Sequence, residues 1–325
     1  MNSVDETWTA TCKRLQEILN VDTYDRWSDD RLTRALEAYI PLSDEALTAW
    51  DGKYESKVAA VGNAIGPHAP GEMLVVWPET TLPRSMDPRR PERVPFQLRN
   101  LIETHENVAL LLGAQGRPVD DDHANNGCLL VQKSISDTGM DYDWLYSKVR
   151  LVPYGEIVPL REVARFLDYP WGNYDISEGR SNDLVHWRGH GLGLMVCFDN
   201  VFPFLARHSA NQGAGHLILV TNNSWYDLAS GIRQHCDMDI LRAVELRRPL
   251  ARVSTNGYSH IISPEGRVAE ETAVYSDGLI TAEVFPGRGQ SLYMLAGDIF
   301  AQLCVLATVL LVAGALWAGR SEGIF

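Results

Sequence analysis

The sequence predicts an α/β layered fold that ends in one membrane-spanning helix. Seven short apolar runs lack polar alternation, which is the pattern of strands covered on both faces. Helical stretches separate several of these runs, as in α/β proteins. No stretch with linker composition divides them into two cores, so we expect one large domain. The seven runs are Met73–Trp77, Val108–Gly113, Cys128–Gln132, Leu192–Cys197, His216–Thr221, Leu250–Thr255 and His260–Ser263.

Residues 1–56 form an acidic region that the pattern predicts to be helical. Leu32, Leu36 and Ile40 lie on one face of a helix at this spacing. Ser28 precedes them and is expected to cap the helix N-terminus. The first 30 residues carry many charges and no apolar h-region, so we expect no signal peptide.

Residues 57–290 are expected to form the main domain. Its clearest helix spans Gln234–Arg248, where Met238, Leu241 and Val244 share one face. Two segments rich in Pro, Gly and Asp are expected to be surface loops: Ser85–Glu92 and Tyr169–Asn182.

Residues 299–318 read as a transmembrane helix. Ile299–Ala318 contains no charged residue, and at 1.5 Å per residue it spans about 30 Å, the thickness of a bilayer core. Asp298 and Arg320 bracket it, and Trp317 stands where an interfacial aromatic residue is expected. The alternative is a helix buried in the domain core, but such a helix would normally show a polar stripe.

Composition excludes several classes of protein. The chain has 29 Lys and Arg against 42 Asp and Glu, a net charge of −13, which argues against binding to a nucleic-acid backbone. The five cysteines form no CxxC pair, so neither a zinc cluster nor a disulfide framework is indicated. His123, His186 and His235 have no metal-ligand spacing. We therefore expect no metal and no cofactor.

Three reactive side chains stand next to apolar strands. Glu79 follows Met73–Trp77 and a proline, Cys197 closes a strand, and Lys148 precedes another apolar segment. Ligand chemistry in open α/β sheets collects beyond the carboxyl ends of the strands. A thiol becomes a nucleophile when a nearby base removes its proton, and a lysine can stabilise an oxyanion. Each residue also has an ordinary alternative role: a turn residue, an inert packed thiol and a solvated cation.

The amino-acid sequences around these three residues favour a catalytic role. WPETTLP (Trp77–Pro83), YSKVRLVPYGEIVPL (Tyr146–Leu160) and VCFDNVFP (Val196–Pro203) resemble the three catalytic blocks of the nitrilase, or carbon–nitrogen hydrolase, superfamily. TNNSWYD (Thr221–Asp227) and the run QH…RA-x-E…R-x-x-NG within Gln234–Ser259 resemble its apolipoprotein N-acyltransferase branch. The resemblance implies an αββα sandwich as the fold.

The resemblance also implies roles for individual residues. Cys197 would be the nucleophile, Glu79 the general base and Lys148 the cation that stabilises the oxyanion. Glu156 would be a supporting carboxylate that holds Lys148. The backbone N–H of Phe198 is a further candidate for the oxyanion site. Four residues are candidates for the substrate pocket: Trp225, Tyr226, Phe198 and Asp199.

The activity implied by the resemblance is acyl transfer in two steps. Cys197 would take an acyl chain from a phospholipid as a thioester, and the amine of a lipoprotein or another acceptor would then receive it. Phospholipid, acceptor amine and membrane are therefore the expected partners, with the bacterial inner membrane as the expected location. A thioester suits this use because it reacts with amines when water is excluded.

Two departures from the branch pattern shape these expectations. The block after the nucleophile usually reads Cys-Tyr-Glu, whereas this chain has Cys197-Phe198-Asp199. The branch also carries several membrane helices before its catalytic domain, and none is apparent here, so we expect a truncated or divergent version, for example one from a conjugal-transfer plasmid. The membrane face that carries the active site stays open. So do two other functions: hydrolysis of a small amide, and a non-catalytic membrane role in conjugation.

Overall fold

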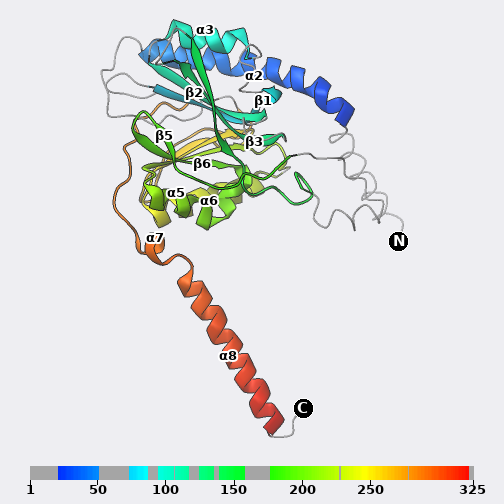
Figure 1. Ribbon diagram of the computed structural model, residues 1–325, viewed down its shortest axis with the longest axis vertical. Coiled ribbons are helices and arrows are strands. Elements are labelled where there is room, and N and C mark those ends of the chain that lie inside the picture. The colour runs from blue at the N-terminus through cyan, green and yellow to red at the C-terminus, as the bar shows by residue number, and fades with distance from the viewer. Residues whose placement is uncertain are drawn as a thin grey trace.

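The computed structural model describes two β-sheets packed face to face, with helices on both outer sides and one long helix projecting from the body (Figure 1). The predicted αββα sandwich is therefore confirmed. The described residues are 21–50, 73–86, 94–105, 107–116, 124–134, 139–157, 176–226, 228–276 and 278–321.

The first sheet has the order β1-β2-β3-β4. Strands β1 and β2 are parallel, whereas β2, β3 and β4 pair in antiparallel fashion. The apolar runs predicted the first three strands. β4 was missed because its residues are mostly half-exposed and alternate with Asp141 and Asp143. The bounds are β1 Met73–Met86, β2 Val108–Gly116, β3 Asn125–Lys133 and β4 Met140–Ser147.

The second sheet has the order β10-β9-β8-β7-β6-β5. Its central strands β6, β7 and β8 are parallel, so their carboxyl ends lie at one edge. Right after β6 the chain forms a short 3-10 turn, η2 (Cys197–Val201). The strands are β5 Val185–Trp187, β6 His190–Val196, β7 His216–Asn222, β8 Leu250–Thr255, β9 His260–Ile262 and β10 Val268–Glu271.

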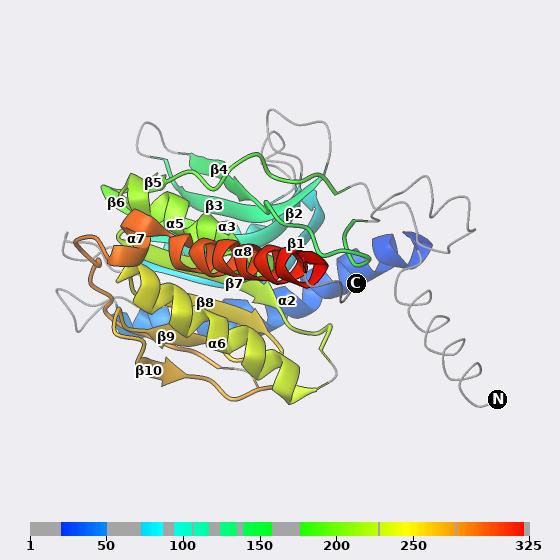
Figure 2. The ribbon, with the colours of Figure 1, turned by 90° about the horizontal axis from the view of Figure 1, so that it is seen from below.

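Helices cover the outer face of each sheet (Figures 1 and 2). Helices α2 and α3 pack on the first sheet, and α5, α6 and α7 pack on the second. Because α2 shares the core of the first sheet, it is part of the sandwich. The bounds are α2 Val21–Trp50, α3 Phe96–Thr104, α5 Pro203–Gln212, α6 Ala229–Leu246 and α7 Leu292–Ala296.

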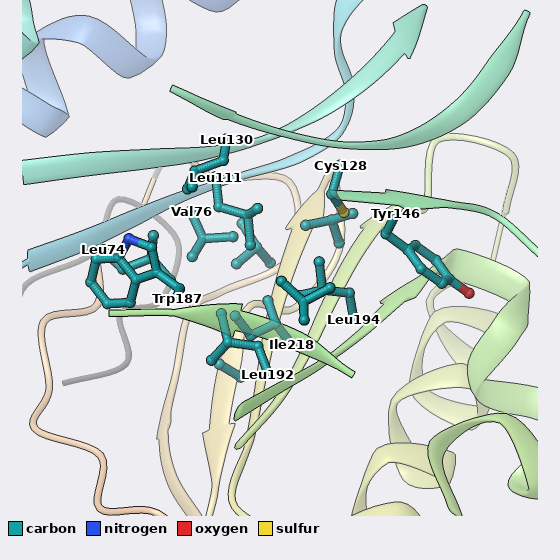
Figure 3. Close-up of a cluster of buried hydrophobic side chains, with 14 of the residues drawn as sticks. Leu74, Val76, Leu111, Cys128, Leu130, Tyr146, Trp187, Leu192, Leu194 and Ile218 are labelled. Carbon is teal, nitrogen blue, oxygen red and sulfur yellow. The ribbon is translucent and has the colours of Figure 1, made fainter. Parts of the chain in front are cut away.

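The main core lies between the two sheets (Figure 3). Leu74, Val76 and Leu111 of the first sheet face Leu194 and Ile218 of the second, and all five are buried. The alternate residues of the same strands pack against the outer helices. Since both faces are covered, these strands are continuous apolar runs.

Helix α8 (Ile299–Ser321) does not pack on the sandwich. Its span Ile299–Ala318 has a mean hydropathy of 2.4 and is 0% buried, so the helix is long and apolar enough to cross a membrane. The short helix α7 precedes it and is held by Arg207 of α5. The Arg207 guanidinium donates to three consecutive carbonyl oxygens of α7, those of Tyr293 (3.0 Å), Met294 (2.9 Å) and Leu295 (3.0 Å).

Some predicted details differ from the structure. Helix α2 already runs through Ser28, so Ser28 is not its N-cap, and the helix continues past Pro41. Helix α6 begins five residues before the predicted Gln234 start. Parts of the predicted loops Ser85–Glu92 and Tyr169–Asn182 lie outside the described residues.

Candidate active site

Glu79 lies in an irregular segment in the middle of β1. The pairing of β1 with β2 shifts register between Trp77 and Leu82, which turns the Glu79 side chain out of the regular pleat. The next residue, Thr80, has a φ of 55°, which is rare for a β-branched residue. Gly113 of β2 makes this path sterically possible, because a Cβ there would lie 2.1 Å from the carbonyl oxygen of Pro78. The position of Glu79 therefore depends on a glycine on the neighbouring strand.

The Glu79 carboxylate is fixed by three donors. Its Oε1 accepts from Asn126 Nδ2 at 2.7 Å and from Lys148 Nζ at 3.3 Å. Its Oε2 accepts from the backbone N–H of Asn222 at 2.7 Å, across the interface between the sheets. Only 5% of Glu79 is exposed. The carboxylate is thus held in one orientation at the point where the two sheets meet.

Lys148 lies between two carboxylates and is buried. Its Nζ also bonds Glu156 at 2.8 Å, and the other Glu156 oxygen accepts from the backbone N–H of Val152 at 2.8 Å. Burial alone would lower the pKa of Lys148, but the charges of Glu79, Cys197 and Glu156 outweigh it and raise the pKa above its usual value. The ammonium therefore stays charged inside the protein.

Cys197 begins η2, at the carboxyl end of β6. Its φ of 48° lies in the left-handed region, so the chain makes a sharp turn at the thiol. Burial and the nearby Glu79 carboxylate raise the pKa of Cys197 to about 12, although the Lys148 ammonium opposes the shift. At neutral pH the thiol is therefore protonated, and a base must remove its proton during attack.

Asp199 stabilises this turn through hydrogen bonds to the neighbouring backbone. Its carboxylate accepts from the Tyr146 hydroxyl at 2.7 Å and from the backbone N–H groups of Arg150 (2.8 Å) and Val196 (3.0 Å). Burial raises the pKa of Asp199 to about 6, although these three donors oppose the shift. The sequence makes Asp199 a candidate for the substrate pocket. In the structure it is fully buried, and its carboxylate accepts the three hydrogen bonds given above.

The other pocket candidates lie nearer to solvent. Trp225 is 58% exposed and Tyr226 38% exposed, on the turn that follows β7. The Tyr226 ring lies 6.0 Å from the imidazole of His235. Phe198 is half-buried and makes an edge contact with Phe202, 5.2 Å between ring centroids. These aromatic side chains remain candidates for contacts with an apolar substrate.

The sequence analysis assigned no role in the site to three residues that lie there. Asn126 donates to Glu79 and also to Glu156 Oε1 at 3.2 Å, so one amide links both carboxylates. Asn222 supplies the backbone N–H described above, and His235 contacts the carbonyl oxygen of Cys197 at 3.2 Å. Polar residues at the ends of apolar strands were the available signal for Asn126 and Asn222.

One group of metal-ligand side chains lies near the site, formed by Cys236, Asp239 and His260. Arg252 Nη1 donates to Asp239 Oδ2 at 2.8 Å, and both residues are fully buried. The guanidinium already neutralises this carboxylate, so the chemistry of the group favours an ion pair over a bound cation.

The arrangement therefore suits nucleophilic catalysis by a thiol. The Lys148 ammonium lies 3.3 Å from the Glu79 carboxylate, and both charges act on the pKa of the buried Cys197 thiol, which begins the turn after β6. The carboxylate can take the thiol proton, and the cation can stabilise negative charge that develops on a substrate oxygen.

Comparison with known families agrees with this class of protein. The chain belongs to the carbon–nitrogen hydrolase family, whose sequence profile matches residues 56–293. An amidase from Nesterenkonia sp. has the same fold, with a TM-score of 0.51 and 17% sequence identity over 83% of this chain and 89% of that chain.

Curated relatives narrow the comparison within the family. The chain is 29% identical over 273 residues to an apolipoprotein N-acyltransferase of Geobacter metallireducens, covering 81% of this chain and 50% of that protein. A protein of the same name from Chlorobaculum tepidum is 28% identical over 298 residues, covering 82% of this chain and 54% of that protein. The chain thus spans about half the length of the curated relatives it matches.

Proposed function

We propose that this protein is a membrane-anchored N-acyltransferase that carries an acyl chain as a thioester on Cys197. The observation that carries the proposal is the buried Lys148, which is held between Glu79 and Glu156 and whose charge opposes the rise in the pKa of the Cys197 thiol. Enclosing three charged groups in a domain core costs free energy, and apolar residues of similar volume would often be at least as stable. A catalytic role explains why the charged groups are present.

In the first step, Glu79 takes the thiol proton as the Cys197 sulfur attacks the ester carbonyl of a phospholipid. The Lys148 ammonium stabilises the oxyanion that forms, together with the backbone N–H of Phe198. The intermediate then breaks its C–O bond. Glu79 returns the proton to the departing oxygen, which gives a lysophospholipid and the thioester on Cys197.

In the second step, the amine of the acceptor attacks the thioester carbonyl. Glu79 accepts a proton from the amine, the C–S bond breaks, and the Cys197 sulfur regains a proton. The product is an amide, and the enzyme returns to its first state. Glu156 acts indirectly, because its carboxylate holds Lys148 in place.

Two features support a lipid donor. Helix α8 exposes an apolar surface along Ile299–Ala318, and the curated relatives are named apolipoprotein N-acyltransferase. We therefore propose that residues 299–318 span the bacterial inner membrane and that residues 57–290 form the catalytic domain, on which α2 packs. The donor is a phospholipid, and the acceptor is the N-terminal amine of a lipoprotein or a similar amine.

The test is to incubate the full chain with phosphatidylethanolamine vesicles and to measure the mass of the Cys197 peptide. We expect a gain of one acyl chain on Cys197, which a lipid-modified cysteine peptide then removes. Cys197→Ala should abolish the adduct. Cys128→Ala, a change at another buried cysteine, should retain it.

The opposite result would identify a different function. Hydrolysis of small amides without a lipid adduct would assign the same Cys197 thioester to water, as in an amidase. A failure of both reactions would leave a non-catalytic membrane protein.

A further inference from the structure

His235 of α6 contacts the backbone of the cysteine that begins η2. Its Nε2 lies 3.2 Å from the carbonyl oxygen of Cys197, and the side chain is buried. That carbonyl belongs to the peptide group whose N–H is supplied by Phe198. The contact therefore acts on the peptide bond that follows the nucleophile, and the thiol itself is not involved.

The neighbours of His235 determine which ring nitrogen carries the hydrogen. Its Nδ1 lies 3.0 Å from Arg252 Nη2, and a guanidinium nitrogen can only donate. Asn223 Nδ2 lies 3.3 Å from the same Nδ1. Nδ1 must therefore accept, and the hydrogen resides on Nε2, which donates to Cys197. Burial and the Arg252 charge also lower the pKa of His235 to about 4, so the ring is neutral.

A buried network fixes this arrangement. Arg252 is paired with Asp239, and Asp239 also bonds His260 Nε2 at 3.0 Å. Asn200 of η2 joins the network, because its Nδ2 donates to Asp239 and to the backbone carbonyl of His235. Burial would raise the pKa of Asp239, but Arg252 and His260 lower it to about 2, so the carboxylate is ionised and holds the guanidinium in place.

We propose that His235 is a positioning residue which strengthens the oxyanion site by polarising the peptide group between Cys197 and Phe198. A hydrogen bond to a peptide oxygen draws electron density from the nitrogen, so the N–H on the other side becomes a stronger donor. The inference rests on the proposed function, since it needs Cys197 as nucleophile. It adds a second source of oxyanion stabilisation to that of Lys148.

Two reactions of the same sulfur separate this role from a structural one. Acylation by p-nitrophenyl acetate passes through a tetrahedral oxyanion: the S–C bond forms, the C–O bond breaks and p-nitrophenol leaves. Alkylation by iodoacetamide occurs at a saturated carbon, where iodide leaves and no oxyanion forms. Both rates are read for the full-length protein in detergent, from the mass of the Cys197 peptide.

Three variants complete the test. His235→Leu removes the donor, and His235→Asn keeps an amide near Arg252 but is too short to reach the Cys197 carbonyl. His235→Gln places a donor at the position of Nε2 and should rescue. Cys236→Ala is the matched control, because this buried residue is the next one on α6.

We expect His235→Leu and His235→Asn to slow acylation by about tenfold or more. Alkylation should change by less than about twofold, because it does not use the oxyanion site. His235→Gln and Cys236→Ala should retain acylation. Equal losses in both reactions, or no loss in either, would overturn the inference.

The same measurements separate the inference from the proposed function. A wild-type protein that the ester acylates but phospholipid does not would refute lipid transfer, while the variants still decide the role of His235. A wild-type protein that the ester never acylates at Cys197 would refute both.

Discussion

The candidate site and helix α8 invert the usual distribution of polar and apolar groups in opposite ways. The site encloses Glu79, Lys148 and Cys197 inside the sandwich, although charged groups normally stay in water. Helix α8 exposes hydrocarbon that would normally be buried. Each region would be a defect in an ordinary soluble protein. Both features suit the proposed acyl transfer, which needs a site sheltered from water and access to lipid.

The largest expected effect comes from removing the buried cation. Lys148→Met leaves Glu79 and Glu156 buried without a counter-charge, so we expect a loss of about 3–5 kcal/mol in the free energy of unfolding. Acylation of Cys197 should fall at least about 100-fold, because the oxyanion loses its cation. Lys133→Met, at the half-buried end of β3, is the control. Near-normal acylation in Lys148→Met would contradict the role given to Lys148.

Removal of α8 tests the other half of the comparison. A chain that ends at Asp298 should lose binding to phospholipid vesicles in a flotation assay, because Ile299–Ala318 supplies the apolar surface. Acylation by a water-soluble ester should persist, because α8 projects away from the sandwich that holds the site (Figure 1). Vesicle binding that survives the truncation would place the lipid contact on the domain.

A smaller effect is expected from the glycine that lies beside Glu79. Gly113→Ala would place a Cβ 2.1 Å from the carbonyl oxygen of Pro78, so β1 must move and carry Glu79 with it. We expect about 1–3 kcal/mol of destabilisation in urea unfolding and a disproportionate loss of acylation. Gly314→Ala is the matched control, since a Cβ there meets nothing within 4 Å. Equal activity in both variants would show that Glu79 tolerates the shift.

The mildest test concerns the buried acid under the nucleophile. Burial raises the pKa of Asp199 from its usual value of 3.8 to about 6, so between these pH values the folded state binds a proton that the unfolded chain has released. The contribution of Asp199 to the free energy of unfolding is therefore fully present below about pH 4. It falls by about 2–3 kcal/mol as the pH rises through about 6. Asp199→Asn should remove this dependence, measured as the wild-type minus variant free energy of unfolding. A difference that rises with pH would contradict the shift.

The fold was largely predictable because a strand that is buried on both faces has a run of apolar residues without polar alternation. β7 is buried throughout and β8 over its first four residues, and their predicted positions agree with the structure to within one residue. Strand β10 escaped because all four of its residues are exposed and its sequence contains three polar or small residues. Edge strands of this kind are specified by pairing with a neighbour, which composition does not record.

The site was predictable only in part, and for a different reason. The segments around Glu79, Lys148 and Cys197 resemble known catalytic blocks, so these residues could be named in advance. Asn126 and His235 could not, because they act through partners 47 and 38 positions away in the chain. Such contacts exist only after the two sheets and α6 have packed together.

The attachment of α8 determines how the enzyme would search for its substrate. Arg207 binds three consecutive carbonyls at the end of α7, so the junction between the sandwich and α8 is braced at several points. A domain mounted in this way on a bilayer would explore two dimensions, and the proposed lipid substrate would be present at high local concentration. A long flexible tether would let the same domain tumble away from the surface. If the proposed span is correct, the bracing of this short helix would replace rare encounters in solution with repeated sampling of neighbouring lipids.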